Sequence, residues 1–105
     1  MAQFDFYANP HLESRRFVPY VLDVQSALID QLSTRLVVPL SRVGVQQVRL
    51  PSSLCPVLEV AGDSLALMPH LAAPVAVQKL KAPAGSLAHC AADIIAAMDA
   101  VLSGF

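Results

Sequence analysis

The sequence predicts a mainly β domain that ends in one α-helix, arranged as a small, strongly bent sheet or barrel. Two patterns predict it. Several stretches alternate apolar and polar residues, as strands do, whereas residues 86–103 space apolar side chains by three and four, as helices do. The chain has 105 residues, of which 55% are apolar. This size suits one core, so residues 1–105 are interpreted as a single domain.

Strands are expected wherever the alternation is clear in the first half of the chain. Residues 3–7 form the first strand, residues 9–16 a polar loop, and residues 17–25 the second strand. The two faces of this second strand are Tyr20, Leu22 and Val24 on one side and Val21, Asp23 and Gln25 on the other. Residues 34–40 form the third strand. Because Pro39 cannot donate to a ladder, this strand is predicted to be an edge strand or to end there.

The second half of the chain begins with a predicted hairpin. Residues 56–61 and 64–68 flank Gly62-Asp63, a dipeptide suited to a two-residue turn. A further strand is expected over residues 74–80, and Pro83-Ala84-Gly85 then breaks the chain before the terminal helix.

The terminal helix is predicted to start at Ser86, a suitable N-cap, and to run to about Ser103. The stripe expected to face the core is Leu87, Ala91, Ile94, Met98, Val101 and Phe105. The opposite side carries Ala88, Ala92, Asp93, Ala96 and Asp99. Small residues there allow a partner helix or sheet to approach, or simply suit solvent exposure. The apolar end, Ser103-Gly104-Phe105, is expected either to dock on its own domain or to contact a protein partner.

Charge and motif content argue against most catalytic and nucleic-acid functions. The net charge is −1 and the seven Lys and Arg residues are scattered, so direct nucleic-acid binding is not favoured. Zinc-site spacings, clustered glycines and nucleophile motifs are missing from the sequence, which predicts no metal, no cofactor and no enzymatic activity. The carboxylates lack a nearby base or acid and are expected to be solvated.

The same residues indicate a cytoplasmic binding protein. The sequence has neither a signal peptide nor an apolar run of the roughly 18–20 residues that cross a bilayer. Cys55 and Cys90 are interpreted as small buried hydrophobes in a reduced protein. The candidate contact groups are Leu28, Ile29 and the C-terminal residues.

A set of segments spread over nearly the whole chain has a characteristic order and spacing. They are Gln3-Phe4 with Tyr7, Asp23-Val24-Gln25-Ser26, Leu28-Ile29-Asp30, Arg35-Leu36-Val37-Val38-Pro39-Leu40, Pro56-Val57-Leu58, Pro74-Val75-Ala76-Val77, and Asp93-Ile94-Ile95 with a terminal glycine–hydrophobic pair. Together they resemble the CcdB family, toxins of bacterial toxin–antitoxin modules.

The resemblance implies a fold and a set of partners. The fold is an SH3-like, CcdB-type curved antiparallel barrel with a C-terminal helix, paired as a symmetric homodimer. The implied target is the A subunit of DNA gyrase, trapped while it holds cleaved DNA. A disordered segment of a CcdA-type antitoxin blocks this contact, and the dimer represses its own operon only through the antitoxin's DNA-binding domain. No membrane partner is implied.

Carried over by position, the gyrase-binding residues are Leu28, Ile29, Asp99, Leu102, Ser103, Gly104 and Phe105. For the antitoxin, residues 9–16 and the C-terminal helix are candidates. The best-known family member has tryptophan where this chain has Ser103, and asparagine where it has Asp99. Since anchor side chains at hot spots supply about 2 kcal/mol or more, weaker poisoning, altered docking and lost activity are all hypotheses. Phe105, which replaces a smaller aliphatic residue, is expected to supply part of the missing apolar area.

Two other functions stay open at the level of the sequence. One is a non-toxic homologue that only dimerises and binds an antitoxin, which the serine at position 103 favours. The other is a ribonuclease toxin like Kid and MazF, which share the fold. The scattered arginines and negative net charge argue against the basic groove that binding and cleavage of RNA require.

Overall fold

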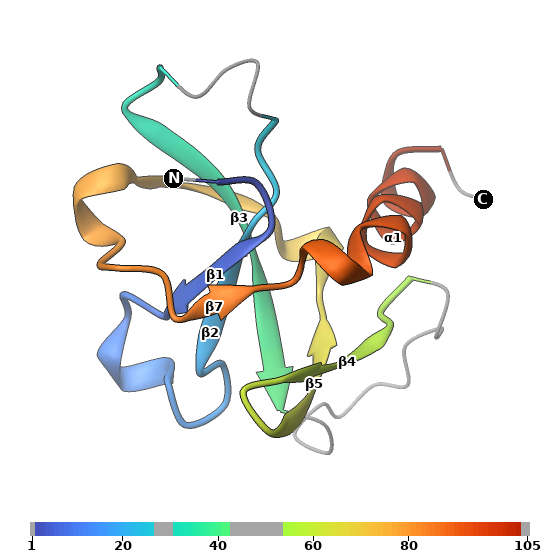
Figure 1. Ribbon diagram of the computed structural model, residues 1–105, viewed down its shortest axis with the longest axis horizontal. Helices are drawn as coiled ribbons and strands as arrows, with labels where there is room; N and C mark the ends of the chain where they lie inside the picture. Colours follow the sequence, from blue (N-terminus) through green and yellow to red (C-terminus); the bar gives the residue numbers. More distant parts are fainter. Residues whose placement is uncertain (1, 27–30, 43–53, 104–105) are drawn as a thin grey trace.

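The computed structural model describes residues 2–26, 31–42 and 54–103 as one curled sheet with one helix (Figure 1). The strands are β1 (Asp5–Ala8), β2 (Tyr20–Asp23), β3 (Thr34–Arg42), β4 (Val57–Val60), β5 (Asp63–Leu67), β6 (Ala73–Ala76) and β7 (Gly85–Ser86), and the helix is α1 (Ala91–Ser103). Short 3-10 turns between them are η1 (Leu12–Ser14), η3 (Pro69–Leu71), η4 (Val77–Lys79) and η5 (Ala88–Cys90).

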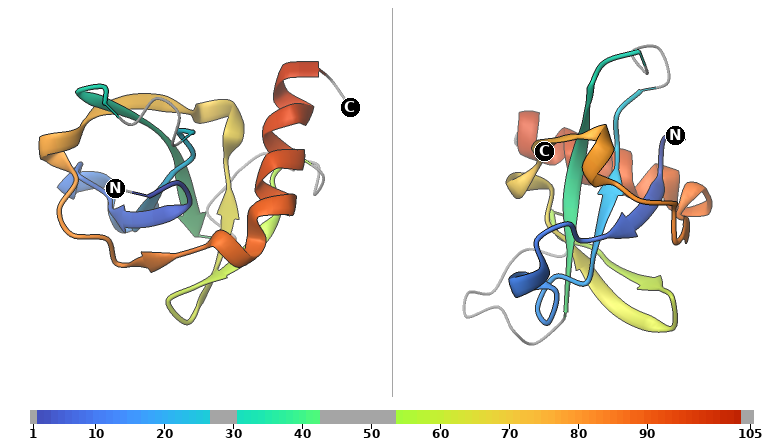
Figure 2. Two further views of the ribbon diagram at one scale, coloured as in Figure 1. Left: turned by 45° about the horizontal axis from the view of Figure 1, so that its top comes forward. Right: turned by 90° about the vertical axis from the view of Figure 1, so that its left-hand side faces the viewer.

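The strands pair antiparallel in the order β4-β5-β3-β2-β1-β7, and β6 pairs with β3 as well. Figure 2 shows in its left-hand view that the sheet curls into an open ring, with α1 standing beside the ring. The prediction of a mainly β, strongly curved sheet with one terminal helix is therefore confirmed. Pairing into a homodimer stays a prediction, because the structure describes a single chain.

The expectation that the strand containing Pro39 lies at an edge or ends there is wrong. β3 continues to Arg42 and pairs with β2 along one side and with β6 and β5 along the other. On that second side β6 pairs with residues 34–37 and β5 pairs with residues 40–42. Pro39 lies between these two paired segments. Its carbonyl accepts the N–H of Met68 at 3.1 Å, and proline cannot return the second bond of this pair.

The β4–β5 hairpin is confirmed, but its turn lies one residue earlier than predicted. Val60 pairs with Asp63, so the two turn residues are Ala61 and Gly62. Their φ angles are 51° and 87°, the positive values that a type I′ hairpin turn requires. Asp63 is a common turn residue, but here it opens β5.

The helix starts later than predicted. Gly85 and Ser86 form β7 against β1, and η5 then leads into α1 at Ala91. A Cβ at Gly85 would lie 2.7 Å from the ring of Phe6, so glycine is needed for β7 to approach β1 this closely. Ser86 does satisfy a backbone donor, because its Oγ accepts the N–H of Ala88 at 3.2 Å.

Other strand bounds also differ from the expected ones. β1 covers Asp5–Ala8, whereas residues 3–7 were predicted. β2 covers only Tyr20–Asp23 of the predicted residues 17–25. The strand expected over residues 74–80 ends at Ala76, where the chain turns into η4.

Two apolar clusters occupy the two faces of the sheet. The larger packs the sheet against α1 and includes Leu22, Val38 and Leu40, with Ile94 and Ala97 from the helix. The smaller one, on the other face, consists of Tyr7, Val21, Val37 and Leu80. The two predicted faces of β2 are thus confirmed, and both are buried.

The predicted orientation of the helix is largely confirmed. Leu87 and Ile94 are buried in the larger cluster, and Ala91 and Met98 pack against it. Val101, which was expected in the buried stripe, is 38% exposed, and Phe105 lies outside the described residues. On the opposite side Ala88, Ala92, Asp93, Ala96 and Asp99 are all exposed. Within the described residues, no helix is long and apolar enough to cross a membrane.

We expect Ala61→Asn to raise the free energy of unfolding by about 0.5–1 kcal/mol, because asparagine tolerates the left-handed backbone that alanine adopts there at a cost. Ala61→Val should lower it, since a β-branched side chain disfavours positive φ. Urea unfolding followed by circular dichroism measures both changes. Equal midpoints for the three proteins would contradict the type I′ assignment.

Candidate functional site

One face of α1 presents two large apolar side chains to solvent. Ile95 and Leu102 are 50% and 81% exposed, and with Asp99 between them they follow the i, i+4, i+7 spacing of one helix face. Val101, on the inner stripe, is also partly exposed there. We call these residues, together with Ser103, the helix tip. Figure 2 shows that this end of α1 stands clear of the strands.

The helix tip is apolar with a negative end. The Ser103 hydroxyl donates back to the carbonyl oxygen of Asp99, four residues earlier in the helix, at 2.7 Å. The last turn contains no basic residue. Asp99 therefore adds its charge to the negative end of the helix dipole, so the tip suits a partner surface that combines apolar side chains with cations.

The structure places part of the predicted gyrase-binding set. Asp99, Leu102 and Ser103 are exposed together on the last turns of α1. Leu28, Ile29, Gly104 and Phe105 lie outside the described residues, so their part of the predicted set stays a prediction. The sequence interpretation missed Ile95, whose seven-residue spacing to Leu102 was the available signal.

The strands that flank residues 27–30 are joined by a buried ion pair. Arg35 on β3 and Asp23 on β2 are 1% and 0% exposed, and their Nη2 and Oδ2 atoms lie 2.7 Å apart. Arg35 Nε donates to the same oxygen at 2.8 Å, and the backbone N–H of Gln25 donates to Asp23 Oδ1 at 3.0 Å. Both carboxylate oxygens are thus paired. The expectation that this carboxylate is solvated is wrong, because the guanidinium compensates its burial.

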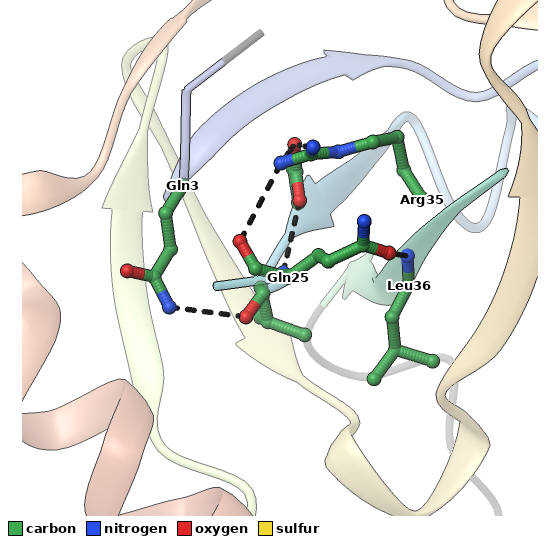
Figure 3. A network of polar contacts seen from close by, with 6 residues as sticks. Gln3, Gln25, Arg35 and Leu36 are labelled. Atoms are coloured by element: carbon green, nitrogen blue, oxygen red, sulfur yellow. Dashed lines mark hydrogen bonds and ion pairs between the residues drawn. The ribbon is translucent and has the colours of Figure 1, made fainter. Parts of the chain in front are cut away.

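Further hydrogen bonds extend this pair into a network (Figure 3). Gln25 Oε1 accepts the N–H of Leu36 at 3.0 Å, and Gln25 also offers its carbonyl to Arg35 Nη2 at 3.4 Å. Gln3 Nε2 donates to the carbonyl of Val24 at 3.2 Å. We call Gln3, Asp23, Gln25 and Arg35 the loop-base network, because their bonds tie together the strand ends on either side of residues 27–30.

Tyr7 packs close to this network. Its side chain is 1% exposed, and its hydroxyl has no hydrogen-bond partner among the described residues. Burial raises the pKa of Tyr7, the negative charges of Asp5 and Asp23 raise the pKa further, and Arg35 lowers it. The phenol therefore stays neutral at physiological pH, and Tyr7 contributes packing and not charge.

The register of the sheet explains how the ion pair forms. Asp23 is opposite Val37 in the β2–β3 ladder, so Arg35 lies two residues along on the same face. In the sequence, this pair could have been recognised from an acidic and a basic residue, Asp23 and Arg35, on the inward faces of two neighbouring predicted strands.

The cysteines are free thiols, Cys55 buried and Cys90 half-buried. The prediction of a buried hydrophobe is confirmed for Cys55, and Cys90 packs against the larger cluster. Cys55 Sγ lies 3.9 Å from His70 Nδ1, and burial raises the pKa of the Cys55 thiol. In the described part of the chain, no three His, Cys, Asp or Glu side chains gather as a metal site would need.

Comparison with known proteins agrees with this architecture. A family model described as CcdB protein matches residues 3–104, nearly the whole chain. A search of curated proteins finds no significant match.

We expect Arg35→Met to lower the free energy of unfolding by about 3–5 kcal/mol, because it leaves the Asp23 carboxylate buried without its partner. The double variant Asp23→Leu/Arg35→Met should recover most of this loss, since it removes both charges. Urea unfolding measures all three proteins.

The matched control is Arg42→Met, which breaks the exposed Arg42–Asp63 pair at 3.5 Å. It should cost less than about 1 kcal/mol, because exposed ion pairs contribute little. Similar losses for Arg35→Met and Arg42→Met would contradict the importance assigned to the buried pair.

Proposed function

Because the chain belongs to the CcdB family, whose membership indicates the toxin of a toxin–antitoxin system, we propose that it is a non-enzymatic poison of DNA gyrase. In this proposal it acts as a homodimer and binds the A subunit of gyrase while the enzyme holds cleaved DNA. A CcdA-type antitoxin neutralises it and brings it to operator DNA. The observation that carries the proposal is the helix tip, an exposed apolar stripe at the position that the resemblance assigns to gyrase contact.

The exposed side chains of the helix tip support a role in protein binding. Leu102 is 81% exposed and Ile95 is 50% exposed, although aliphatic side chains of this size are mostly buried. Neither contributes to the larger core cluster, whereas their neighbours Ile94 and Ala97 do. The core of the domain is therefore complete without these two side chains. Binding of a partner over them would remove their apolar surface from water.

Binding through this tip would be repeated by symmetry. In a two-fold toxin dimer each protomer carries one α1, so a two-fold target meets two copies of the same contact. Apolar ends that enter a groove between two gyrase subunits would hold the subunits in the cleaved state. Such a poison needs no catalytic group of its own, which agrees with the binding character predicted from the sequence.

Leu102 is the expected anchor of this interface, and Ser103 is not. The Ser103 hydroxyl is already bonded to the Asp99 carbonyl, and serine has no ring to stack on a partner cation. The affinity for gyrase should consequently be lower than that of a relative with an aromatic residue at this position.

We expect Leu102→Asp to abolish gyrase-dependent DNA cleavage, because it places a charge in the apolar contact. The assay adds purified protein to supercoiled plasmid, gyrase and ATP, and measures linear DNA. Val57→Asp is the matched control, since Val57 is 56% exposed on β4 and lies outside the tip. Cleavage that survives Leu102→Asp, or is lost equally with Val57→Asp, would contradict the role of the tip.

We also expect Ser103→Trp to strengthen binding to the gyrase A subunit by about tenfold or more, the range of an added aromatic hot spot. Isothermal titration calorimetry measures the dissociation constant, with Ser103→Ala as the control for loss of the hydroxyl alone. Unchanged affinity for Ser103→Trp would argue that position 103 does not face gyrase.

The second candidate function is a non-toxic homologue that dimerises and binds only an antitoxin. The polar Ser103 in the tip is the observation that favours it. This candidate expects antitoxin binding without either gyrase binding or DNA cleavage by the unmodified chain.

A further inference from the structure

A single hollow beside η4 gathers three cations from two segments that are distant in the sequence. It has a volume of about 370 Å³, and its walls come from residues 8–15 and 78–81. Arg15 belongs to the first segment, and Lys79 and Lys81 belong to the second. Among the described residues that line the hollow none is acidic, and none of the three cations forms an ion pair with another described residue. The hollow therefore concentrates unpaired positive charge in a chain whose net charge is −1.

The buried side chain of Leu80 orients the two lysines. Leu80 has an extended backbone (φ −94°, ψ 114°), and its side chain lies in the smaller cluster. Since neighbouring side chains of an extended chain point to opposite sides, burial of Leu80 turns Lys79 and Lys81 outward. Both lysines are exposed. They are thus two cations on one side of the chain, held there by a core residue between them.

Hydrogen bonds position Arg15 on the other wall of the hollow. Its Nε donates to the carbonyl oxygen of Asn9 at 2.6 Å. Asn9 is 3% exposed, and its side-chain amide donates to the carbonyl oxygen of Val18 at 2.8 Å. The outer nitrogens of Arg15 donate to no described residue and are left for a ligand. A guanidinium fork binds a phosphate through two parallel hydrogen bonds, and one that is already positioned loses less entropy on binding.

Charge, size and wall chemistry together indicate the class of ligand. A single phosphate group carries a charge of about −1.5 to −2 at pH 7, so three cations are better matched by two or more adjacent phosphates. The volume lies within the range of small-molecule sites, roughly 300–1,000 Å³. Pro10 and Leu12 add an apolar wall, and Leu12 is 68% exposed. Such a wall suits the apolar faces of a base and a sugar.

We propose that this hollow binds a nucleoside di- or triphosphate. The phosphates pair with Arg15, Lys79 and Lys81, and the nucleoside covers the apolar wall. The side-chain amide of Gln78, which also lines the hollow, is available to polar atoms of the sugar or the base. The hollow shares no residue with the helix tip, so this binding function is separate from the proposed contact with gyrase.

Isothermal titration calorimetry of the full-length chain with three probes tests the ligand class. ATP should bind, and raising the salt concentration should weaken its binding. Inorganic triphosphate should bind about tenfold more weakly than ATP, because it cannot cover the apolar wall. Adenosine, which has no phosphate, should not bind. Absence of ATP binding, or equal affinity for ATP and inorganic triphosphate, would overturn the proposal.

Charge variants test the place of binding. Lys79→Gln/Lys81→Gln should weaken ATP binding by about tenfold or more, and Arg15→Gln should weaken it as well, because each removes charge-assisted hydrogen bonds. Lys79→Arg/Lys81→Arg keeps both charges and should bind within about threefold of the unmodified chain. All three side chains are exposed, so the variants are expected to fold, which circular dichroism checks.

The matched control for Arg15→Gln is Arg16→Gln. Arg16 is the next residue and is also exposed, but it does not line the hollow, and its guanidinium lies 5.0 Å from the ring centre of Phe17. Arg16→Gln should leave the dissociation constant for ATP within about twofold, because exposed charges away from a contact contribute little. An equal loss for Arg15→Gln and Arg16→Gln, or an unchanged constant for Lys79→Gln/Lys81→Gln, would contradict the site.

A last titration separates a nucleotide from nucleic acid, which also offers phosphates. The phosphates of a single DNA strand carry one charge each and follow one another about 3.4 Å apart along the helix axis, so they are less concentrated than those of ATP. A single-stranded DNA oligonucleotide at the same phosphate concentration should not displace ATP. Displacement would assign the three cations to nucleic acid and overturn the proposal.

Discussion

The whole sheet depends on one strand that serves three neighbours. β3 pairs with β2 on one side and with β6 and β5 in succession on the other. It also divides its side chains between both cores, with Val38 and Leu40 in the larger cluster and Val37 in the smaller. A strand with this many partners is buried along most of its length, and its one inward cation, Arg35, is held only because Asp23 lies on the neighbouring strand.

The sequence was sufficient for the elements whose signal is local. Alternation identified β2 and β3, and the three-four spacing identified α1 and its buried face. Other features depend on neighbours that alternation does not reveal. Pro39 is compatible with a central strand only because β6 ends and β5 begins opposite it. Ser86 has the local features of a helix cap. It belongs to β7 instead, because Gly85 beside it lets the backbone approach the Phe6 ring closely.

The candidate sites differ in the same way. Asp99, Leu102 and Ser103 of the helix tip could be placed by the family resemblance, whereas Ile95 was missed although it lies seven residues before Leu102 on the same helix. The clustering of Arg15, Lys79 and Lys81 around one hollow could not, since Arg15 and the two lysines are far apart in the sequence and the fold brings them together. Charge is therefore separated on the described surface, with Asp99 on the tip of α1 and these three cations around the hollow.

The pairing of β1 with β7 has a consequence for how the protein is made. Phe6 is opposite Gly85, and the flanking backbone bonds, Ala84 to Phe6 and Leu87 to Phe4, join the two ends of the chain. Contacts this distant in sequence close slowly. During translation, β1 leaves the ribosome early, but its outer edge stays open until residues 84–87 have been synthesised. Closure of the barrel at this edge is therefore a late step of folding, and α1, which follows β7 in the chain, docks on the sheet later still.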